Sequence, residues 1–242
     1  MNIIRHIPNT ITSMNLLCGV MGVIFSLQGR FDLPFYLMIA AAICDFLDGF
    51  AARLLKAYSP VGKELDSLAD LISFGMLPSI MLYKLMDTFH SGEWICYIPL
   101  IIVVLSAVRL AKFNVDDRQT ENFIGLATPA CAMICGSFTY YSTIPAEGIV
   151  FFNDMIFSAW AIPVASVVLS LLLVSEVPMF SLKFKKGSPY NTVRKYFIGI
   201  SVFAAIAAVI FKTNWAFVVH LVFVLYLAFN LLRFLFSLKI SK

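Results

Sequence analysis

The chain has 242 residues, of which 60% are hydrophobic and only 13% are charged, and its formal net charge is +4. Soluble domains carry about 25% charged residues, so this composition excludes a soluble globular protein and indicates a polytopic membrane protein. No basic, aromatic-rich domain is left over to bind nucleic acid, so we expect no nucleic-acid partner.

Eight apolar segments follow one another along the chain. A helix needs about 20 predominantly apolar residues to cross a bilayer, and these segments approach or reach that length. In chain order they cover residues 11–27, 33–55, 68–86, 95–110, 125–144, 151–174, 196–211 and 215–236. The longest polar connection, 175–195, is too short to hold a core of its own. We therefore expect an all-α helical bundle that forms a single membrane domain over residues 1–242.

The lysines and arginines are distributed unequally between the two sides of this bundle. If the N-terminus is cytoplasmic and the eight spans alternate, 15 of the 18 basic residues lie on the cytoplasmic side, and only Arg30, Lys84 and Lys212 lie outside. Such an excess follows the positive-inside rule. We therefore expect a multi-pass protein of the cell (inner) membrane with both termini in the cytoplasm. Its net positive charge favours contact with anionic membrane lipids.

Four aspartates interrupt the apolar pattern of the second and third segments, namely Asp45, Asp48, Asp66 and Asp70. One charged residue at the centre of a membrane helix costs about 2.5–3.5 kcal/mol. Four unpaired ones cost on the order of 10 kcal/mol, which is as much as the net stability of a whole fold. Another group must therefore compensate these charges.

The spacing of the aspartates places them on helical stripes, because residues three and four apart share one face of an α-helix. The stripe of the first helix is Asp45, Asp48, Gly49 and Ala52, and that of the second is Gly62, Asp66 and Asp70. Ser59 and Pro60 suit the N-cap and the first position of the second helix. Because the two helices are consecutive and antiparallel, we expect the four carboxylates to converge near the cytoplasmic surface.

Converging carboxylates repel one another unless cations lie among them. An all-oxygen cluster without His or Cys suits hard ions such as Mg²⁺, Mn²⁺ or Ca²⁺. Gly49, Ala52 and Gly62 on the same stripes leave room for a flat group or a close backbone approach. The alternative is that these small residues simply let two membrane helices pack closely. The carboxylates and the small residues together predict a metal site with free space beside it.

The same residues form the pattern D-x2-D-G-x2-A-R-x8-G-x3-D-x3-D from Asp45 to Asp70, which has eight fixed positions within 26 residues. This pattern resembles the signature of the CDP-alcohol phosphotransferases. The resemblance implies transfer of a phosphatidyl group from a CDP-linked lipid to an alcohol, with CMP as the leaving group. It also implies that two divalent cations (Mg²⁺ or Mn²⁺, with Ca²⁺ as a further candidate) bridge the diphosphate, and that the protein is a homodimer.

Roles for individual residues follow from this resemblance. Asp45, Asp48 and Asp66 would be metal ligands. Asp70 would be both a ligand and the catalytic general base that takes the proton of the alcohol. The residues implied to contact the cytidine and the phosphates are Gly49, Ala52, Arg53, Gly62, Asn9 and Thr12, the last two from the polar start of the first helix.

Two further stretches bear on the acceptor alcohol: RLAKFN (109–114), which closes the fourth span, and FIGLATPA (123–130), which opens the fifth. Arg109 and Lys112 share a helical face, and such a pair can hold a carboxylate; alternatively, both anchor the helix at lipid phosphates. Both stretches resemble the phosphatidylserine synthase branch, although Lys112 replaces an arginine and Ala127-Thr128 replaces a proline and a variable residue. The resemblance implies CDP-diacylglycerol as donor and L-serine as acceptor. The implied serine site is Arg109, Lys112, Asn114 and Thr128.

Two alternatives stay open at this point. Glycerol 3-phosphate or inositol phosphate, as acceptors in the same chemistry, would also require basic residues. Intramembrane acidic clusters also occur in divalent-cation transporters, although those commonly show inverted repeats or paired broken helices, which are not evident here. We expect residues 9–175 to form the six-helix core of the family, 196–236 to add two spans, and the active site to face the cytoplasm.

Overall fold

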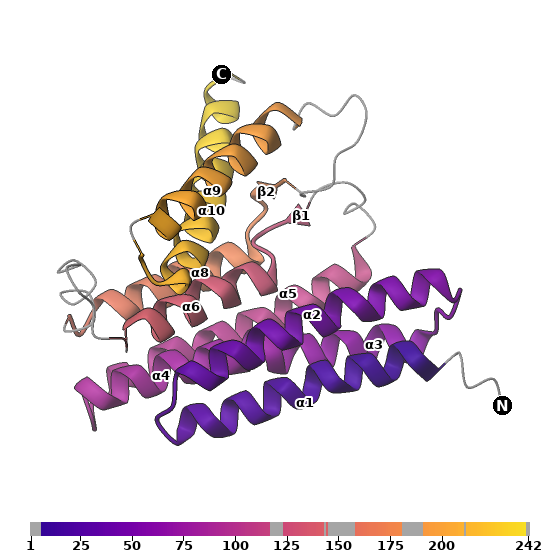
Figure 1. The fold of residues 1–242 in the computed structure, drawn as a ribbon, viewed down its shortest axis with the longest axis horizontal. Helices are drawn as coiled ribbons and strands as arrows, with labels where there is room; N and C mark the ends of the chain where they lie inside the picture. Colours follow the sequence, from indigo (N-terminus) through magenta and orange to yellow (C-terminus); the bar gives the residue numbers. More distant parts are fainter. Residues whose placement is uncertain are drawn as a thin grey trace.

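The computed structural model describes residues 6–116, 123–142, 144, 158–180, 191–210 and 212–240. Most of them are helical, so the expected all-α membrane fold is confirmed (Figure 1). The elements in chain order are α1 (Ile7–Leu27), α2 (Asp32–Leu54), α3 (Pro60–Asp70), the π-helix η2 (Leu71–Met76), α4 (Leu77–Phe89), the 3₁₀-helix η3 (Trp94–Leu100), α5 (Ile101–Val115), β1 (Phe123–Ile124), α6 (Thr128–Ser142), α8 (Ala161–Val174), β2 (Pro178–Met179), α9 (Asn191–Ile210) and α10 (Trp215–Ile240).

Five helical segments among the described residues are long and apolar enough to cross a membrane. They are Ile7–Leu27, Asp32–Leu54, Pro60–Phe89, Trp94–Val115 and Trp215–Leu235. Ala161–Val174 is a shorter apolar helix. Most described residues of the other predicted spans are helical as well, in α6, α8 and α9, whereas residues 125–127 and 158–160 lie before α6 and α8 and are not helical. Residues 151–157 of the sixth predicted span lie outside the described residues.

The helices of the first two thirds of the chain lie roughly along one direction, and α9 and α10 form a hairpin inclined steeply to it (Figure 1). The antiparallel hairpin of α1 and α2 packs against α3 and α4, while α5 packs against α8 and α6 packs against both α4 and α10. Buried apolar side chains form one cluster where α1, α2, α4 and α6 meet, and another among η3, α5, α6, α8 and α10.

The start of α3 is fixed by two local residues. The Ser59 hydroxyl accepts a hydrogen bond from the Gly62 amide (2.9 Å), and Pro60 occupies the first turn. The predicted N-cap is therefore confirmed. Because the cap determines where α3 begins, it also determines which face of the helix carries Asp66 and Asp70.

The π-helical turn η2 begins immediately after Asp70 and joins α3 to α4 within one long helix. Such turns occur frequently at functional sites. Helix α1 packs closely against η2, because a Cβ at Gly19 would lie only 2.9 Å from Ser73 Cα. The Ser73 hydroxyl also donates to the Asn15 carbonyl (3.0 Å). The chain just beyond Asp70 is thus tied to α1.

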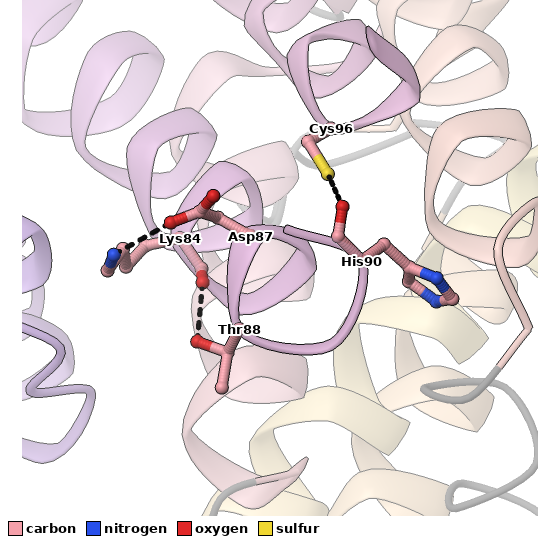
Figure 2. Close-up of polar contacts among 5 residues, drawn as sticks. All are labelled: Lys84, Asp87, Thr88, His90 and Cys96. Atoms are coloured by element: carbon pink, nitrogen blue, oxygen red, sulfur yellow. Dashed lines mark hydrogen bonds and ion pairs between the residues drawn. The ribbon is translucent and has the colours of Figure 1, made fainter. Parts of the chain in front are cut away.

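Short-range polar contacts hold the far end of the same long helix (Figure 2). Lys84 pairs with Asp87 (2.8 Å), and the Thr88 hydroxyl donates to the Lys84 carbonyl (2.8 Å). The Cys96 thiol donates to the His90 carbonyl (3.2 Å), which closes the connection from α4 to η3. At 1.5 Å per residue this end lies about 25 Å along the helix from the aspartates of α3.

Candidate metal centre and substrate pockets

Three of the four predicted metal ligands lie together where α2 faces α3. Asp45 and Asp48 come from α2 and Asp66 from α3, and each offers a carboxylate oxygen within 4.8 Å of the others. Asp48 is buried, and the other two are partly buried. The spacing of the sequence contributes to this arrangement, because Asp45 and Asp48 share one face of α2.

The donor set fits a hard divalent cation. Asp48 Oδ2 and Asp66 Oδ1 are buried and have no hydrogen-bond partner among the described residues. A buried carboxylate oxygen without a donor is strongly unfavourable unless a cation compensates it. Carboxylate oxygens are the ligands that Mg²⁺, Mn²⁺ and Ca²⁺ prefer. These orphaned oxygens would therefore be satisfied by metal binding.

Asp70, the fourth predicted ligand, lies at the last residue of α3, beside this group. Its carboxylate interacts electrostatically with the carboxylates of Asp45, Asp66 and Asp48. The Asn15 side chain donates from Nδ2 to Asp70 Oδ1 (3.3 Å). Asp70 is therefore the one member of the four that has an amide donor from α1.

A pocket of about 200 Å³ adjoins the aspartates between α1, α2 and α3. Of the six residues implied to contact the nucleotide, the five that line it are Asn9, Thr12, Gly49, Ala52 and Gly62. A Cβ at Gly62 would lie 2.9 Å from Asn9 Oδ1 and from Ser59 Oγ, so any side chain there would displace these two pocket-lining side chains. A Cβ at Gly49 would meet nothing within 4 Å, so Gly49 leaves the pocket open. Arg53 is exposed in the last turn of α2 and does not line the pocket.

A second pocket, of about 400 Å³, contains Arg109 and Lys112 in its wall. Arg109 is buried, donates from Nη1 to the Thr128 hydroxyl (3.1 Å) and stacks over the Phe113 ring (5.3 Å to the centroid). Its guanidinium also interacts electrostatically with Asp70, which links this pocket to the carboxylates. Lys112 is exposed. The structure thus brings together three of the four residues of the implied serine site.

Asn114, the fourth, points elsewhere. Its Nδ2 donates to the Ser67 hydroxyl (2.9 Å), and its carbonyl accepts from Lys63 Nζ (2.8 Å). Both contacts tie the end of α5 to α3, and Asn114 is not among the residues that line the second pocket. Asn114 therefore positions the two helices against each other.

Several residues of these pockets are absent from the sequence-based assignment. Lys63 and Tyr58 line the pocket beside the aspartates, and Asp116 and Glu176 line the pocket of Arg109. Asn15 was missed as well, although an amide side chain within an apolar segment is a usable sequence signal, and the structure shows this amide to be wholly buried. Glu176 gave no such signal, because it lies 67 positions from Arg109 in the sequence and only tertiary packing joins them.

The fold and the site together define a helical membrane protein with a carboxylate cluster between two spans and polar pockets beside it. Residues 5–172 match the CDP-alcohol phosphatidyltransferase family, and the chain belongs to this family. The family membership that the aspartate pattern implied is therefore confirmed.

Curated relatives refine the comparison. A CDP-diacylglycerol–serine O-phosphatidyltransferase of Helicobacter pylori is 34% identical over 129 residues, which are 52% of this chain and 54% of that protein. The enzyme of the same name from Bacillus subtilis is 34% identical over 147 residues, 60% of this chain and 82% of that protein. An archaetidylserine synthase of Methanothermobacter thermautotrophicus is 32% identical over 149 residues, 58% and 61% of the two chains. The aligned part thus spans only about half of the Helicobacter protein.

Proposed function

We propose that this protein transfers the phosphatidyl group from CDP-diacylglycerol to L-serine, giving phosphatidylserine and CMP. The observation that carries the proposal is the set of three carboxylates within 4.8 Å of one another, with two orphaned buried oxygens, beside a pocket lined by the small residues of the family pattern. The names of the relatives support serine as the acceptor. The archaeal relative's name pairs serine with a different lipid, which supports serine as the shared feature.

The four aspartates would hold two divalent cations, Mg²⁺ or Mn²⁺. Bound there, such cations neutralise charge on the diphosphate and on the attacking and leaving oxygens. The pocket at Gly49 and Gly62 would take the cytidine, and Lys63 in its wall would add positive charge near the phosphates. The diacylglycerol tails would stay in the bilayer among the helices.

Asp70 would act as the general base. It lies next to the three clustered carboxylates and is electrostatically linked to Arg109 in the wall of the second pocket. We propose that the hydroxyl of the acceptor enters from that pocket and that Asp70 accepts its proton. Asn15 would fix the orientation of the Asp70 carboxylate through its hydrogen bond to Oδ1.

The second pocket would bind the acceptor. Serine is a zwitterion, and its carboxylate needs a cation when it binds beside anionic phosphates. Arg109 and Lys112 would supply that cation, with Thr128 holding one nitrogen of the guanidinium. Asp116 and Glu176 give the same pocket negative side chains that suit the serine ammonium group.

The membrane arrangement belongs to the same proposal. The chain would cross the cell membrane eight times, with both termini and the carboxylate cluster on the cytoplasmic side, as the distribution of basic residues predicts. A six-helix core would be followed by two further spans in a single membrane domain. The family resemblance supports a homodimer.

An acceptor assay tests this proposal. The purified protein, supplied with Mn²⁺ or Mg²⁺ and CDP-diacylglycerol, is given serine, glycerol 3-phosphate or inositol phosphate in turn, and CMP release is measured. We expect CMP and phosphatidylserine with serine and no comparable turnover with the other two. Equal or greater turnover with glycerol 3-phosphate would mean that serine is not the preferred acceptor. Cation flux without CMP release would instead indicate a transporter.

A further inference from the structure

We propose that Tyr226 and Asn230 of α10 are positioning residues for the acceptor pocket, because they hold the strand pair that connects to one of its walls. Both residues lie outside the stretch that matches the family, residues 5–172. The inference rests on the proposed function in one respect, since it takes the pocket of Arg109 and Lys112 as the site where the acceptor binds.

Two side chains one helical turn apart on α10 capture the backbone of Phe180. The Phe180 amide donates to Asn230 Oδ1 (2.8 Å), and the Tyr226 hydroxyl donates to the Phe180 carbonyl (3.1 Å). Asn230 Nδ2 donates in turn to the Tyr226 carbonyl (2.7 Å), which fixes the orientation of its amide. All three residues are buried. Because water does not reach their polar groups, these groups depend on one another for hydrogen bonds.

Phe180 is also locked by its side chain. Its ring is 1% exposed and meets the rings of Tyr226 and Phe197 edge to face, at 5.1 and 5.7 Å between centroids. Such pairs contribute beyond simple burial. The position of Phe180 relative to the hairpin of α9 and α10 is therefore determined by both its backbone and its ring.

Phe180 directly follows β2, which pairs with β1, and one wall of the pocket is made by Ile124 of β1 and by the segment just before β2. The two strands pair antiparallel, with Phe123 opposite Met179, and the ladder continues from the Gly125 amide to the Val177 carbonyl (2.9 Å). The pocket residues on this wall are Ile124 and the run Leu173, Val174, Ser175 and Glu176. A displacement of Phe180 would therefore move the wall.

Gly125 shows how closely the two segments approach. Its φ is +77°, and a Cβ there would lie 2.6 Å from the Leu173 carbonyl oxygen and 2.9 Å from that of Ser175. Because the two segments are in close contact at Gly125, we expect a displacement of β2 to displace Ile124 and the start of α6 as well.

Tyr226 reaches the pocket by a second route. Its hydroxyl end interacts electrostatically with the Arg109 guanidinium, the buried cation of the pocket. Arg109 in turn donates to Thr128 at the start of α6 (3.1 Å). One turn of α10 thus contacts the Phe180 backbone beyond β2 and influences the cation of the pocket electrostatically, and this double link makes α10 a determinant of acceptor affinity.

The test compares Asn230→Leu and Tyr226→Phe with the control Tyr196→Phe, whose ring is 67% exposed on α9. KM for serine, KM for CDP-diacylglycerol and kcat are measured on the full-length protein. We expect Asn230→Leu to raise the KM for serine about tenfold, because a buried amide loses its acceptor, and Tyr226→Phe to raise it about threefold. The KM for the lipid should stay within about twofold, and the control should behave as the unaltered protein.

Hydrogen–deuterium exchange of the same proteins provides a readout that does not depend on activity. The amides of Gly125, Leu126 and Phe180 should exchange faster in Asn230→Leu, whereas those of α1 and α2 should not change. Unchanged exchange at these amides, an unchanged KM for serine in both variants, or an equal rise of both KM values would each overturn the positioning role.

The two proposals fail in different ways. If the unaltered protein uses another alcohol in place of serine, the serine assignment is wrong, and the KM comparison is made with that alcohol. If it turns over no alcohol, the proposed function is wrong, and the exchange measurement alone decides whether α10 holds the strand pair.

Discussion

Asn15 and Asp70 are 55 positions apart in the sequence and are joined by a hydrogen bond from Asn15 Nδ2 to Asp70 Oδ1 (3.3 Å). Asn15 is wholly buried on α1, and its own carbonyl accepts from Ser73 in the π-helical turn that follows Asp70. Helix α1 therefore contacts both the carboxylate assigned as the general base and the turn that follows it. If Asp70 is the general base as proposed, α1 contributes to catalysis by orienting this carboxylate.

Replacing Asn15 by Leu should lower kcat by about tenfold or more, because the amide that orients Asp70 is lost while side-chain volume is nearly kept. The KM values for both substrates should change little, since Asn15 lines neither pocket. Ser13→Ala, on the exposed side of α1, is the control and should leave kcat unchanged. Steady-state kinetics decides the matter, and an unaltered kcat in Asn15→Leu would remove the positioning role.

Replacing Asp48 by Asn should have opposite effects on stability with and without metal. In EDTA the variant should melt at a higher temperature than the unaltered protein, because one of three mutually repelling carboxylates is gone. Saturating Mn²⁺ should stabilise the unaltered protein by about 2–3 kcal/mol at a hundred times the Kd, and the variant much less. Thermal melting in detergent measures both effects.

The matched control for Asp48→Asn is Asp87→Asn. Asp87 lies at the end of the long helix that is far from the aspartates of α3, and it pairs with Lys84 (2.8 Å; Figure 2). It should leave the Mn²⁺-dependent rise in Tm intact. An equal Mn²⁺ response in Asp48→Asn and the unaltered protein would mean that Asp48 does not ligate the cation.

Replacing Gly49 by Leu should raise the KM for CDP-diacylglycerol about tenfold or more without lowering Tm, because the new side chain occupies the nucleotide pocket and leucine is a good helix former. A Cβ at Gly49 meets nothing within 4 Å, so no clash within the fold is expected. Gly199→Leu on α9 is matched, since that position is equally open, and it should change neither quantity. A Gly49→Leu enzyme with an unchanged lipid KM would place the nucleotide elsewhere.

Replacing Arg109 by Lys keeps the charge but removes the planar fork that binds a carboxylate through two hydrogen bonds. We expect the KM for serine to rise about tenfold, which corresponds to about 1.4 kcal/mol, with the KM for the lipid nearly unchanged. Arg30→Lys, exposed beside Asp32, serves as the control. Equal changes in both KM values would show that Arg109 acts on the site as a whole.

Local pattern was enough to predict much of this site. The three- and four-residue spacing of Asp45, Asp48 and Asp66, with the cap at Ser59, predicted the facing stripes, and the structure brings those three carboxylates together. Five of the six residues assigned to the nucleotide line one pocket. Such features depend on helix periodicity and capping, which neighbouring residues determine on their own.

Long-range features could not be predicted in the same way. Asn114 binds Ser67 on α3, whereas the sequence resemblance assigned it to serine. Arg53 fits the family pattern but stays at the surface.

The sequence by itself determined the membrane setting, the family and the acidic cluster, because composition and short-range periodicity carry that information. Only the tertiary structure decided that Asn15 holds Asp70, that Glu176 joins Arg109 in one pocket, and that Asn230 of α10 holds the Phe180 backbone. Each of these relationships joins residues about 50 or more positions apart. Contacts of that kind depend on how whole helices pack against one another, and no local pattern in the chain encodes them.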